Sequence, residues 1–340
     1  MKSIAFVIPY FGHFPNYFDK WLKSCSYNST IDWIIFTDCH EEYDYPINVH
    51  VNYCTFEDMK VLFQSKFDFK ISLNKPYKLC DYKCAYGYIF EKELEKYDFW
   101  GYCDVDLIWG NLRQFISDEM LNEYDRVGLY GHCSIIKNKK ELKELFMKNV
   151  EGVPNYRWVY SSSMSFCFDE TQGLNKIFSK TKKTMVEIPA MFDVDMKRHG
   201  FVPMHSEAID FDIQPYYFIF REGELIIKGL DSKDEHNISY AHFQKRDMKD
   251  LTPQNNSCYY IFPNEFSSNT ENFNPALCSY YSKIRFEWYK LKFNIFKEDL
   301  LGHHKFYHHK YRYLHKISWV ASDRISQVIG FLRKIFSFIF

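Results

Sequence analysis

The sequence predicts an α/β protein with a mixed, mostly parallel sheet flanked by helices. Residues 3–8 form a continuous apolar run that ends at Pro9, as in a parallel strand buried on both faces. Residues 14–27 place apolar side chains on one face of a helix, and two further strands are expected at residues 32–38 and 47–53. Strands and helices that alternate with short connections favour right-handed crossovers and therefore a parallel sheet.

Ligands of such sheets bind at the carboxyl ends of the strands. Three parts of the chain should therefore share one edge: the loop after the first strand, the end of the second strand, and the turn after the run at residues 97–103. The candidate ligand-binding residues of the first two parts are Pro9, Tyr10, Phe11, Gly12 and Asp38.

The run at residues 97–103 is aromatic and ends in two carboxylates, Asp104 and Asp106. Successive side chains of an extended segment point to opposite faces, so these two carboxylates point the same way. Together they offer hard oxygen ligands for a divalent cation such as Mn²⁺ or Mg²⁺. Because Asp-x-Asp is a common triplet, a solvated turn is the alternative.

Two later segments also carry candidate residues. A second Asp-x-Asp, Asp193 and Asp195, follows Pro189 at an expected helix start, where carboxylates also serve as caps. His242 ends an expected strand and is followed by Lys245 and by a second basic residue. An imidazole with two carboxylates suits manganese, whereas a structural histidine is the alternative.

Bulk properties exclude some classes of function. The net charge of −1 gives no argument for nucleic-acid binding. Aromatic residues make up 20% of the chain, which fits stacking surfaces for sugars and bases but fits an AT-rich genome equally well. The cysteines show no CxxC pair, and we interpret them as free thiols in a reducing cytosol. No signal peptide and no apolar run long enough to span a bilayer is recognised.

The run at residues 97–112 resembles the strand and Asp-x-Asp turn of nucleotide-sugar glycosyltransferases of the GT-A type. The resemblance implies that Asp104 and Asp106 hold a metal ion, which in turn holds the donor diphosphate. Residues 74–90 resemble the helix before this turn, which implies donor contacts for Asp81 and Lys83; solvated charges on an ordinary helix are the alternative.

Residues 241–245, Ala-His-Phe-Gln-Lys, resemble the late histidine and lysine of these enzymes. The resemblance implies that His242 is the third metal ligand and that Lys245 contacts the diphosphate. It favours a retaining over an inverting mechanism, and it implies that Asp193 and Asp195 reach the sugar as catalytic residues. The Gly, Pro and Trp that flank this His and Lys in lactosyl-type galactosyltransferases are missing here.

Residues 1–250 as a whole resemble bacterial glycosyltransferase-like proteins found among genes for surface polysaccharide. The most specific matches are residues 6–12, 100–106 and 241–245. The resemblance implies a metal-dependent hexosyltransferase that uses a nucleotide sugar, with UDP favoured, and builds a capsule or O-antigen type of glycan on a free or lipid-linked acceptor. The alternative is a non-catalytic nucleotide- or glycan-binding subunit of a polysaccharide assembly complex.

We expect three parts: a GT-A type catalytic domain at residues 1–250, a polar linker at 251–282, and a helical extension at 283–340. In the extension, Lys and Arg far outnumber Asp and Glu, and residues 317–340 fit an amphipathic helix rich in aromatic side chains. Such a helix suits an anionic membrane surface, which predicts a cytoplasmic protein attached to the inner face of the cell membrane. A homodimer contact, or packing on the protein itself, is the alternative.

Overall fold

The computed structural model describes residues 1–271 except residue 197 and residues 205–215, 231–233 and 254–255. The predicted extension at 283–340, and with it the amphipathic helix, lies outside the described residues. Among the described residues, no helix combines the length and the apolar character that crossing a membrane requires.

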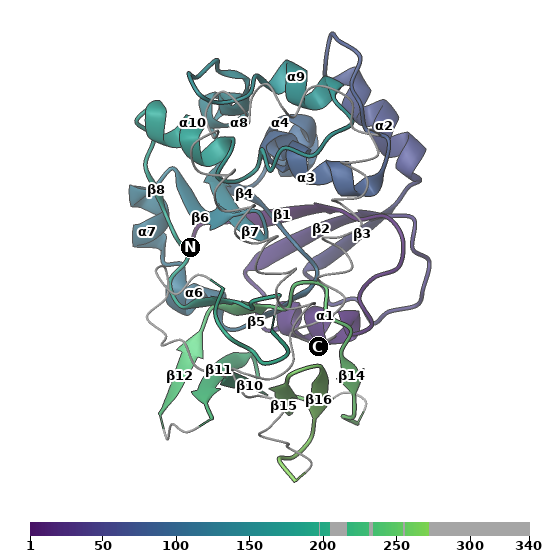
Figure 1. The fold of residues 1–340 in the computed structure, drawn as a ribbon, viewed down its shortest axis with the longest axis vertical. Coiled ribbons are helices and arrows are strands. Elements are labelled where there is room, and N and C mark those ends of the chain that lie inside the picture. Colours follow the sequence, from purple (N-terminus) through teal and green to yellow (C-terminus); the bar gives the residue numbers. More distant parts are fainter. Residues whose placement is uncertain (197, 205–215, 231–233, 254–255, 272–340) are drawn as a thin grey trace, which may run out of the picture. The chain divides into compact units, whose positions relative to one another are not determined.

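The central sheet has seven strands in the order β3-β2-β1-β4-β7-β6-β8 (Figure 1). The strands are β1 Ile4–Pro9, β2 Ile31–Thr37, β3 Val49–Tyr53, β4 Phe99–Cys103, β6 Arg126–Tyr130, β7 Cys133–Lys137 and β8 Met185–Val186. Strand β1 is parallel to β2 and β4, and β3 and β8 add parallel pairs at the two ends. Only β7 runs antiparallel to its neighbours. The predicted α/β class, with a mixed and mostly parallel sheet flanked by helices, is confirmed.

The sheet is covered on both faces, which explains the continuous apolar runs of β1 and β4. In β1, Ala5 and Val7 enter one core cluster, whereas Ile4, Phe6 and Ile8 enter another. Alternate side chains of a strand point to opposite faces, so these two clusters are the two layers of the core.

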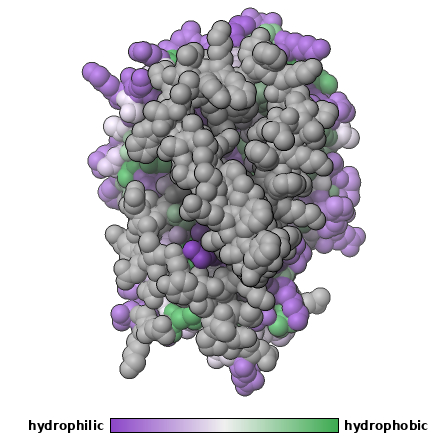
Figure 2. Space-filling view, viewed as in Figure 1, coloured by the Kyte–Doolittle hydropathy of each residue, from purple (hydrophilic) through white to green (hydrophobic). Residues whose placement is uncertain are grey.

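Helices of the first layer come from the middle of the chain (Figure 1). They are α2 Phe56–Ser65, α3 Leu79–Tyr82, α4 Tyr86–Ile89, α5 Glu91–Leu94, α8 Lys140–Lys143, α9 Tyr156–Ser161 and α10 Leu174–Lys180, with the 3-10 turns η1 Pro76–Lys78, η2 Lys83–Ala85 and η3 Leu145–Met147. The other layer contains α1 Phe18–Ser26, α6 Leu112–Phe115 and α7 Asp118–Glu123. At the upper rim of the view in Figure 2, the coloured side chains are mostly hydrophilic.

The expected helix at residues 74–90 is instead a chain of short turns, η1, α3, η2 and α4. A Cβ added to Gly87 would lie 2.3 Å from the indole of Trp100, so α4 packs almost directly on β4 at this glycine.

Two smaller sheets accompany the central one. A three-stranded sheet pairs β13 Tyr240–His242 antiparallel with β5 Leu107–Trp109 and parallel with β9 Met191–Asp193. A six-stranded sheet has the order β12-β11-β10-β15-β16-β14. Its strands are β10 Tyr216–Arg221, β11 Glu224–Gly229, β12 Glu235–Ile238, β14 Lys249–Asp250, β15 Cys258–Phe262 and β16 Glu265–Ser267.

Two expectations from the sequence differ from this arrangement. Asp193 ends strand β9 rather than beginning a helix, because residues 191–193 pair with β13. Part of the expected linker is not a linker: β15 pairs with β10 and with β16. Tyr259, Ile261 and Phe266 are buried in the core of this sheet, so the segment contributes apolar packing despite its polar neighbours.

Candidate functional site

The turn with two carboxylates joins the central sheet to the three-stranded sheet. Asp104 follows β4, and its backbone N–H donates to the carbonyl of His132 at 3.0 Å. Asp106 precedes β5, and its carbonyl accepts from the N–H of Phe243 at 2.9 Å. Asp104 is partly exposed, whereas Asp106 is 4% exposed. The turn is therefore held at both ends by later parts of the chain.

His242 meets both carboxylates from the end of β13, where it pairs with Leu107. Its Nε2 lies 3.3 Å from Oδ1 of Asp106 and 3.9 Å from Oδ2 of Asp104. These ligand atoms form a group in which all lie within 4.8 Å of one another. The structure thus brings together the three residues expected to bind a metal ion.

The carboxylates control the charge of His242. Burial opposes the imidazolium, but the carboxylates of Asp106 and Asp193 outweigh it and raise the pKa of His242 well above its usual value. Burial likewise opposes the carboxylate of Asp106, yet His242 and the N–H of Lys245 hold its pKa well below the usual range. The site strongly favours positive charge between these side chains.

Two lysines flank the group. Buried Lys83 donates from Nζ to Oδ1 of Asp104 at 2.5 Å and to the carbonyl of Gly131 at 2.8 Å. Exposed Lys245 donates its backbone N–H to Oδ2 of Asp106 at 2.6 Å, and its Nζ lies 4.7 Å from the ring centroid of Tyr77.

The backbone beside Lys245 is unusual. Gln244 and Lys245 have φ of +55° and +56°, a left-handed conformation that costs about 1–2 kcal/mol per non-glycine residue. The conformation places the N–H of Lys245 on the carboxylate of Asp106. Strained backbone of this kind is concentrated at functional sites.

The loop after β1 lies at the same edge. Gly12, with φ of +97°, donates its N–H to Oδ1 of exposed Asp38 at 2.8 Å. Burial, followed by the charges of Asp106 and Asp104, raises the pKa of Tyr10 to about 12, and its hydroxyl donates to the carbonyl of His13 at 3.1 Å. Pro9 ends β1, and Phe11 packs against Phe56 with ring centroids 5.2 Å apart.

Asp81 is not part of this edge. Its side chain is fully buried, pairs with Nζ of Lys78 at 2.7 Å, and accepts backbone N–H bonds from Phe166 and Phe168. The carboxylate is thus engaged by the protein, and a solvated helix face does not describe it. Asp81 holds the segment at residues 164–168 against the helical layer.

The second Asp-x-Asp divides between two environments. The carboxylate of Asp193, at the end of β9, accepts from Nδ1 of His242 at 2.8 Å and from Nε2 of Gln244 at 2.5 Å. Asp195 is held through its backbone: its N–H donates to Val202, and its carbonyl accepts from Arg246. Asp193 therefore joins the metal-ligand group directly.

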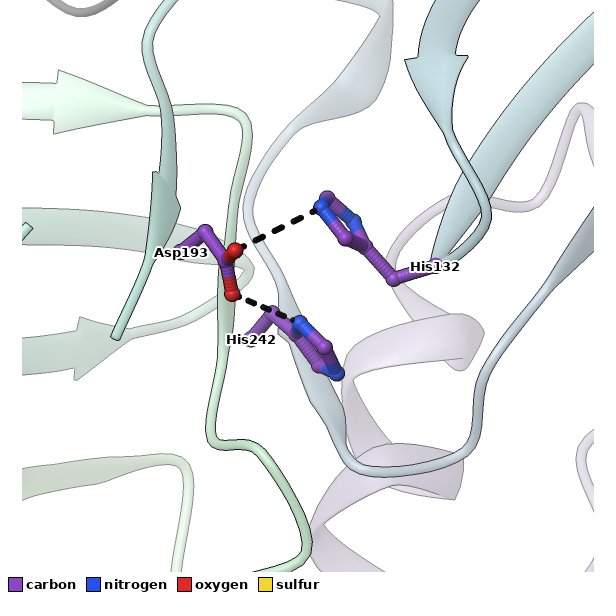
Figure 3. A group of neighbouring side chains, drawn as sticks. All are labelled: His132, Asp193 and His242. Atoms are coloured by element: carbon purple, nitrogen blue, oxygen red, sulfur yellow. Dashed lines mark hydrogen bonds and ion pairs between the residues drawn. The ribbon is translucent and has the colours of Figure 1, made fainter. Parts of the chain in front are cut away.

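The sequence analysis assigned no role to His132, which the structure places beside this group. His132 lies in the turn between β6 and β7, and its ring centroid is 4.5 Å from that of His242. Figure 3 shows its Nε2 facing Asp193, with 4.0 Å between Nε2 and Oδ2. Burial, followed by the nearby His242, lowers the pKa of His132 to about 4, so its ring is neutral at pH 7. Its place in the short turn that follows β6 is the signal that could have indicated a role.

Asp169 is a second buried group that the sequence analysis missed. Burial raises its pKa well above the usual value, although nearby Lys83 opposes the shift. Its neighbour Glu170 accepts the N–H of Gly131 at 2.6 Å, beside the carbonyl to which Lys83 donates. No local periodicity in the sequence distinguishes these acids from solvated ones.

The described residues thus form an α/β protein with a compact group of carboxylates, imidazoles and lysines at the carboxyl edge of its central sheet. A family model described as a family of unknown function, DUF6625, matches residues 6–270, and the chain belongs to this family. No curated protein matches the chain.

Among solved structures, the galactosyltransferase LgtC in complex with donor and acceptor sugar analogues is 12% identical, covering 56% of this chain and 75% of LgtC, with a TM-score of 0.31. An active-site mutant of LgtC is 11% identical, covering 71% and 87%, with a TM-score of 0.34. The glycosyltransferase GlyE of Streptococcus pneumoniae TIGR4 is 12% identical, covering 55% and 44%, with a TM-score of 0.26. Similarity at these TM-scores does not by itself establish a shared activity.

Proposed function

We propose that the protein is a metal-dependent glycosyltransferase that moves a hexose-type sugar from a nucleotide-sugar donor, with UDP favoured, to a growing bacterial surface glycan. The observation that carries the proposal is the meeting of Asp104, Asp106 and His242, with Lys83 and Lys245 beside them. A divalent cation flanked by lysines suits a diphosphate, which is the leaving group of such donors.

The residues fit a divalent cation. Two carboxylates and one imidazole suit Mn²⁺ or Mg²⁺, and Nε2 of His242 already faces the carboxylates of Asp106 and Asp104. A metal-bound histidine is usually oriented by a carboxylate on its other nitrogen, and Asp193 occupies that place at 2.8 Å. When bound, the cation would neutralise charge on the leaving nucleoside diphosphate.

The lysines would add to this neutralisation. Lys83 is directed at Asp104 from the helical layer, so its ammonium lies beside the place where a diphosphate would meet the cation. Lys245 is exposed, and the described contacts that hold it are its backbone N–H on Asp106 and the ring of Tyr77, so its ammonium can reach a bound donor. Preorganised positive charge of this kind stabilises the leaving group in the transition state.

The loop of residues 9–12 and Asp38 would bind the nucleoside end of the donor. The carboxylate of Asp38 is exposed and oriented by the N–H of Gly12, which suits an acceptor for ribose hydroxyls or base N–H groups. The ring of Tyr10 stacks on Phe14 with centroids 4.9 Å apart, and its other face would be the one to stack on a base.

The geometry favours a positioning role for Asp193, because it is 2% exposed and its oxygens face two imidazoles. Asp195 keeps its proposed place near the transferred sugar. A retaining reaction, which the histidine resemblance favours, requires no protein base at the acceptor hydroxyl.

Transfer or hydrolysis with a panel of nucleotide sugars, with and without Mn²⁺, tests the proposal. We expect turnover of one UDP-sugar that stops when the metal is chelated, and NMR of the product then gives the stereochemistry. Metal-dependent UDP binding without turnover of any donor would instead support a non-catalytic nucleotide-binding subunit. Absence of both binding and turnover would refute the metal and donor assignments.

A further inference from the structure

We propose that His132, Asp193 and His242 form a second cation site, which takes a borderline divalent metal ion such as Zn²⁺ and competes with the site at Asp104 and Asp106. The existence of this site does not depend on the proposed transferase activity. Only its inhibitory effect on that activity does.

Three separate elements supply the ligands (Figure 3). His132 precedes β7, Asp193 ends β9 and His242 ends β13, and their exposures are 5%, 2% and 5%. Each oxygen of Asp193 faces one imidazole: Oδ1 lies 2.8 Å from Nδ1 of His242, and Oδ2 lies 4.0 Å from Nε2 of His132. Ligands with bonds of about 2.0–2.2 Å to a tetrahedral ion lie somewhat over 3 Å apart, so small side-chain shifts would place all three on one ion.

Among the residues that the structure describes, the buried Nε2 of His132 has no hydrogen-bond partner. Leaving a buried polar atom unpaired costs about 1–3 kcal/mol, and a metal ion between His132 and Asp193 would supply the missing partner. The other ring nitrogen, Nδ1, lies 3.2 Å from the hydroxyl of Tyr240. In the tautomer in which Nδ1 donates to this hydroxyl, Nε2 presents a lone pair towards Asp193, as metal-binding histidines do.

The two sites differ in ligand chemistry. The group of Asp104, Asp106 and His242 offers two carboxylates and one imidazole, which suits Mn²⁺ and Mg²⁺. The group of His132, Asp193 and His242 offers two imidazoles and one carboxylate, which suits Zn²⁺ and neighbouring borderline metals.

His242 belongs to both groups, through Nε2 in one and Nδ1 in the other. An ion on Nδ1 replaces the hydrogen bond by which Asp193 orients the ring, and it places a second divalent charge across the imidazole. Both effects weaken the binding of Mn²⁺ through Nε2. Because coupling between two sites is reciprocal, Mn²⁺ weakens Zn²⁺ to the same degree.

Zinc binding is measured by calorimetry on the full-length chain. Every protein tested carries asparagine in place of four histidines that can bind zinc themselves, His303, His304, His308 and His309. The chain with these four replacements alone is called the background protein. A separate variant of the background protein carries Asp104→Asn, which removes zinc binding at the carboxylate pair. We expect one zinc site that persists in Asp104→Asn and is weakened at least about 10-fold in both His132→Asn and His132→Gln.

The matched control is His236→Asn, which removes an exposed histidine on β12 and should leave zinc affinity unchanged. Circular dichroism and thermal melting establish that each variant is folded. Equal zinc affinity in the folded His132 variants and in the His236 control would overturn the proposal.

Competition is measured by the electron paramagnetic resonance signal of free Mn²⁺. We expect zinc to release bound Mn²⁺ from the background protein, and to do so at concentrations at least about 10-fold higher in His132→Asn. Release at the same zinc concentration in both would mean that zinc enters the Asp104 and Asp106 site directly, and would overturn the shared-ligand assignment. If the background protein binds no Mn²⁺, the metal part of the proposed function fails, while the calorimetric test of the zinc site still stands.

Discussion

Substitutions of Asp104 and Asp106 distinguish a metal site from a solvated turn, because each changes a single oxygen atom of one carboxylate. We expect Asp104→Asn and Asp106→Asn each to reduce Mn²⁺-dependent UDP affinity by more than about 100-fold, because outer-shell losses alone cost 10–100-fold. Calorimetry with UDP and Mn²⁺ measures the loss. Asp68→Asn, at an exposed carboxylate paired with Arg157, is the matched control. Unchanged binding in both site variants would remove the metal assignment.

His242 is held by two carboxylates, so its loss can act through binding or through packing. We expect His242→Ala to weaken Mn²⁺ affinity by at least about 10-fold, since the only imidazole of that group is removed. Asp193→Asn should have a smaller effect, because an amide oxygen still accepts from Nδ1. Metal titration followed by melting distinguishes the roles: an earlier melt with normal Mn²⁺ affinity would assign His242 to the structure alone.

Asp81 tests the difference between a donor contact and a structural ion pair. Removing one partner of a buried pair costs about 3–5 kcal/mol, so we expect Asp81→Ala to lower the free energy of unfolding by this amount. Lys78 would lose its carboxylate, and the N–H groups of Phe166 and Phe168 would lose their acceptor. UDP affinity of the folded protein should stay unchanged. A variant of normal stability with weakened UDP binding would restore Asp81 to the donor site.

At the level of elements, the edge of the central sheet carries a pH-sensitive contact. Glu187, next to β8, accepts from the N–H groups of Leu129 and Ile188, yet burial raises its pKa from 4.5 to about 7. The folded protein therefore binds more protons than the unfolded chain between these values. Its contribution is present in full below about pH 4.5 and is lost as the pH rises to about 7.

We expect Glu187→Gln to remove this part of the pH dependence, because the amide keeps an acceptor for the two N–H groups and carries no charge. Chemical denaturation of both proteins at pH 5 and pH 8 measures it. The variant should gain most in stability relative to the original chain at pH 8. An equal difference in stability at both pH values would show that Glu187 titrates normally in the folded protein.

Strand pairing also brings residues that are distant in the sequence into one site. Pairing of β13 with β9 and β5 places His242 opposite both Asp193 and Leu107, one residue beyond Asp106. This small sheet is thus the element that assembles the candidate ligands. Its formation requires segments from three distant parts of the chain, each only three residues long in the sheet.

At the level of the whole molecule, residues 317–340 bear on whether the protein binds to a membrane. This segment lies outside the described residues, and Ile-Phe-Ser-Phe-Ile-Phe follows Arg333 and Lys334 in its sequence. Basic residues at an anionic membrane contribute about 1 kcal/mol each, and the aromatic contribution is not screened by salt. We expect deletion of 317–340 to release the protein from anionic liposomes, and high salt to do so only in part.

Activity on a short soluble acceptor should survive this deletion, whereas activity on a lipid-linked acceptor should fall. Flotation with liposomes and size measurement of both proteins distinguish membrane binding from a homodimer contact. A full-length protein that never binds liposomes, with a truncated form that turns monomeric, would assign the segment to subunit association.

Much of the fold was predictable because its signals are local. The apolar runs of β1 and β4 reflect strands buried on both faces, and Pro9 and Asp104 occur where these strands end. Asp104 and Asp106 reach His242 from a bend between β4 and β5 and not from an extended strand, so alternation alone does not account for their orientation. Local patterns failed at residues 258–267, where polar neighbours concealed the alternate buried side chains of β15 and β16.

By itself, the sequence determined the α/β class, the edge of the sheet at which a ligand would bind, and the pair of carboxylates at that edge. These features depend on the period of side chains along a strand and on chain direction, both of which are visible within ten residues. Only the tertiary structure decided that Asp193 and His132 reach His242 and that Asp81 is buried with Lys78. Strand register and burial depend on segments far apart in the chain, and the periodicity of a single sequence does not encode which of them meet.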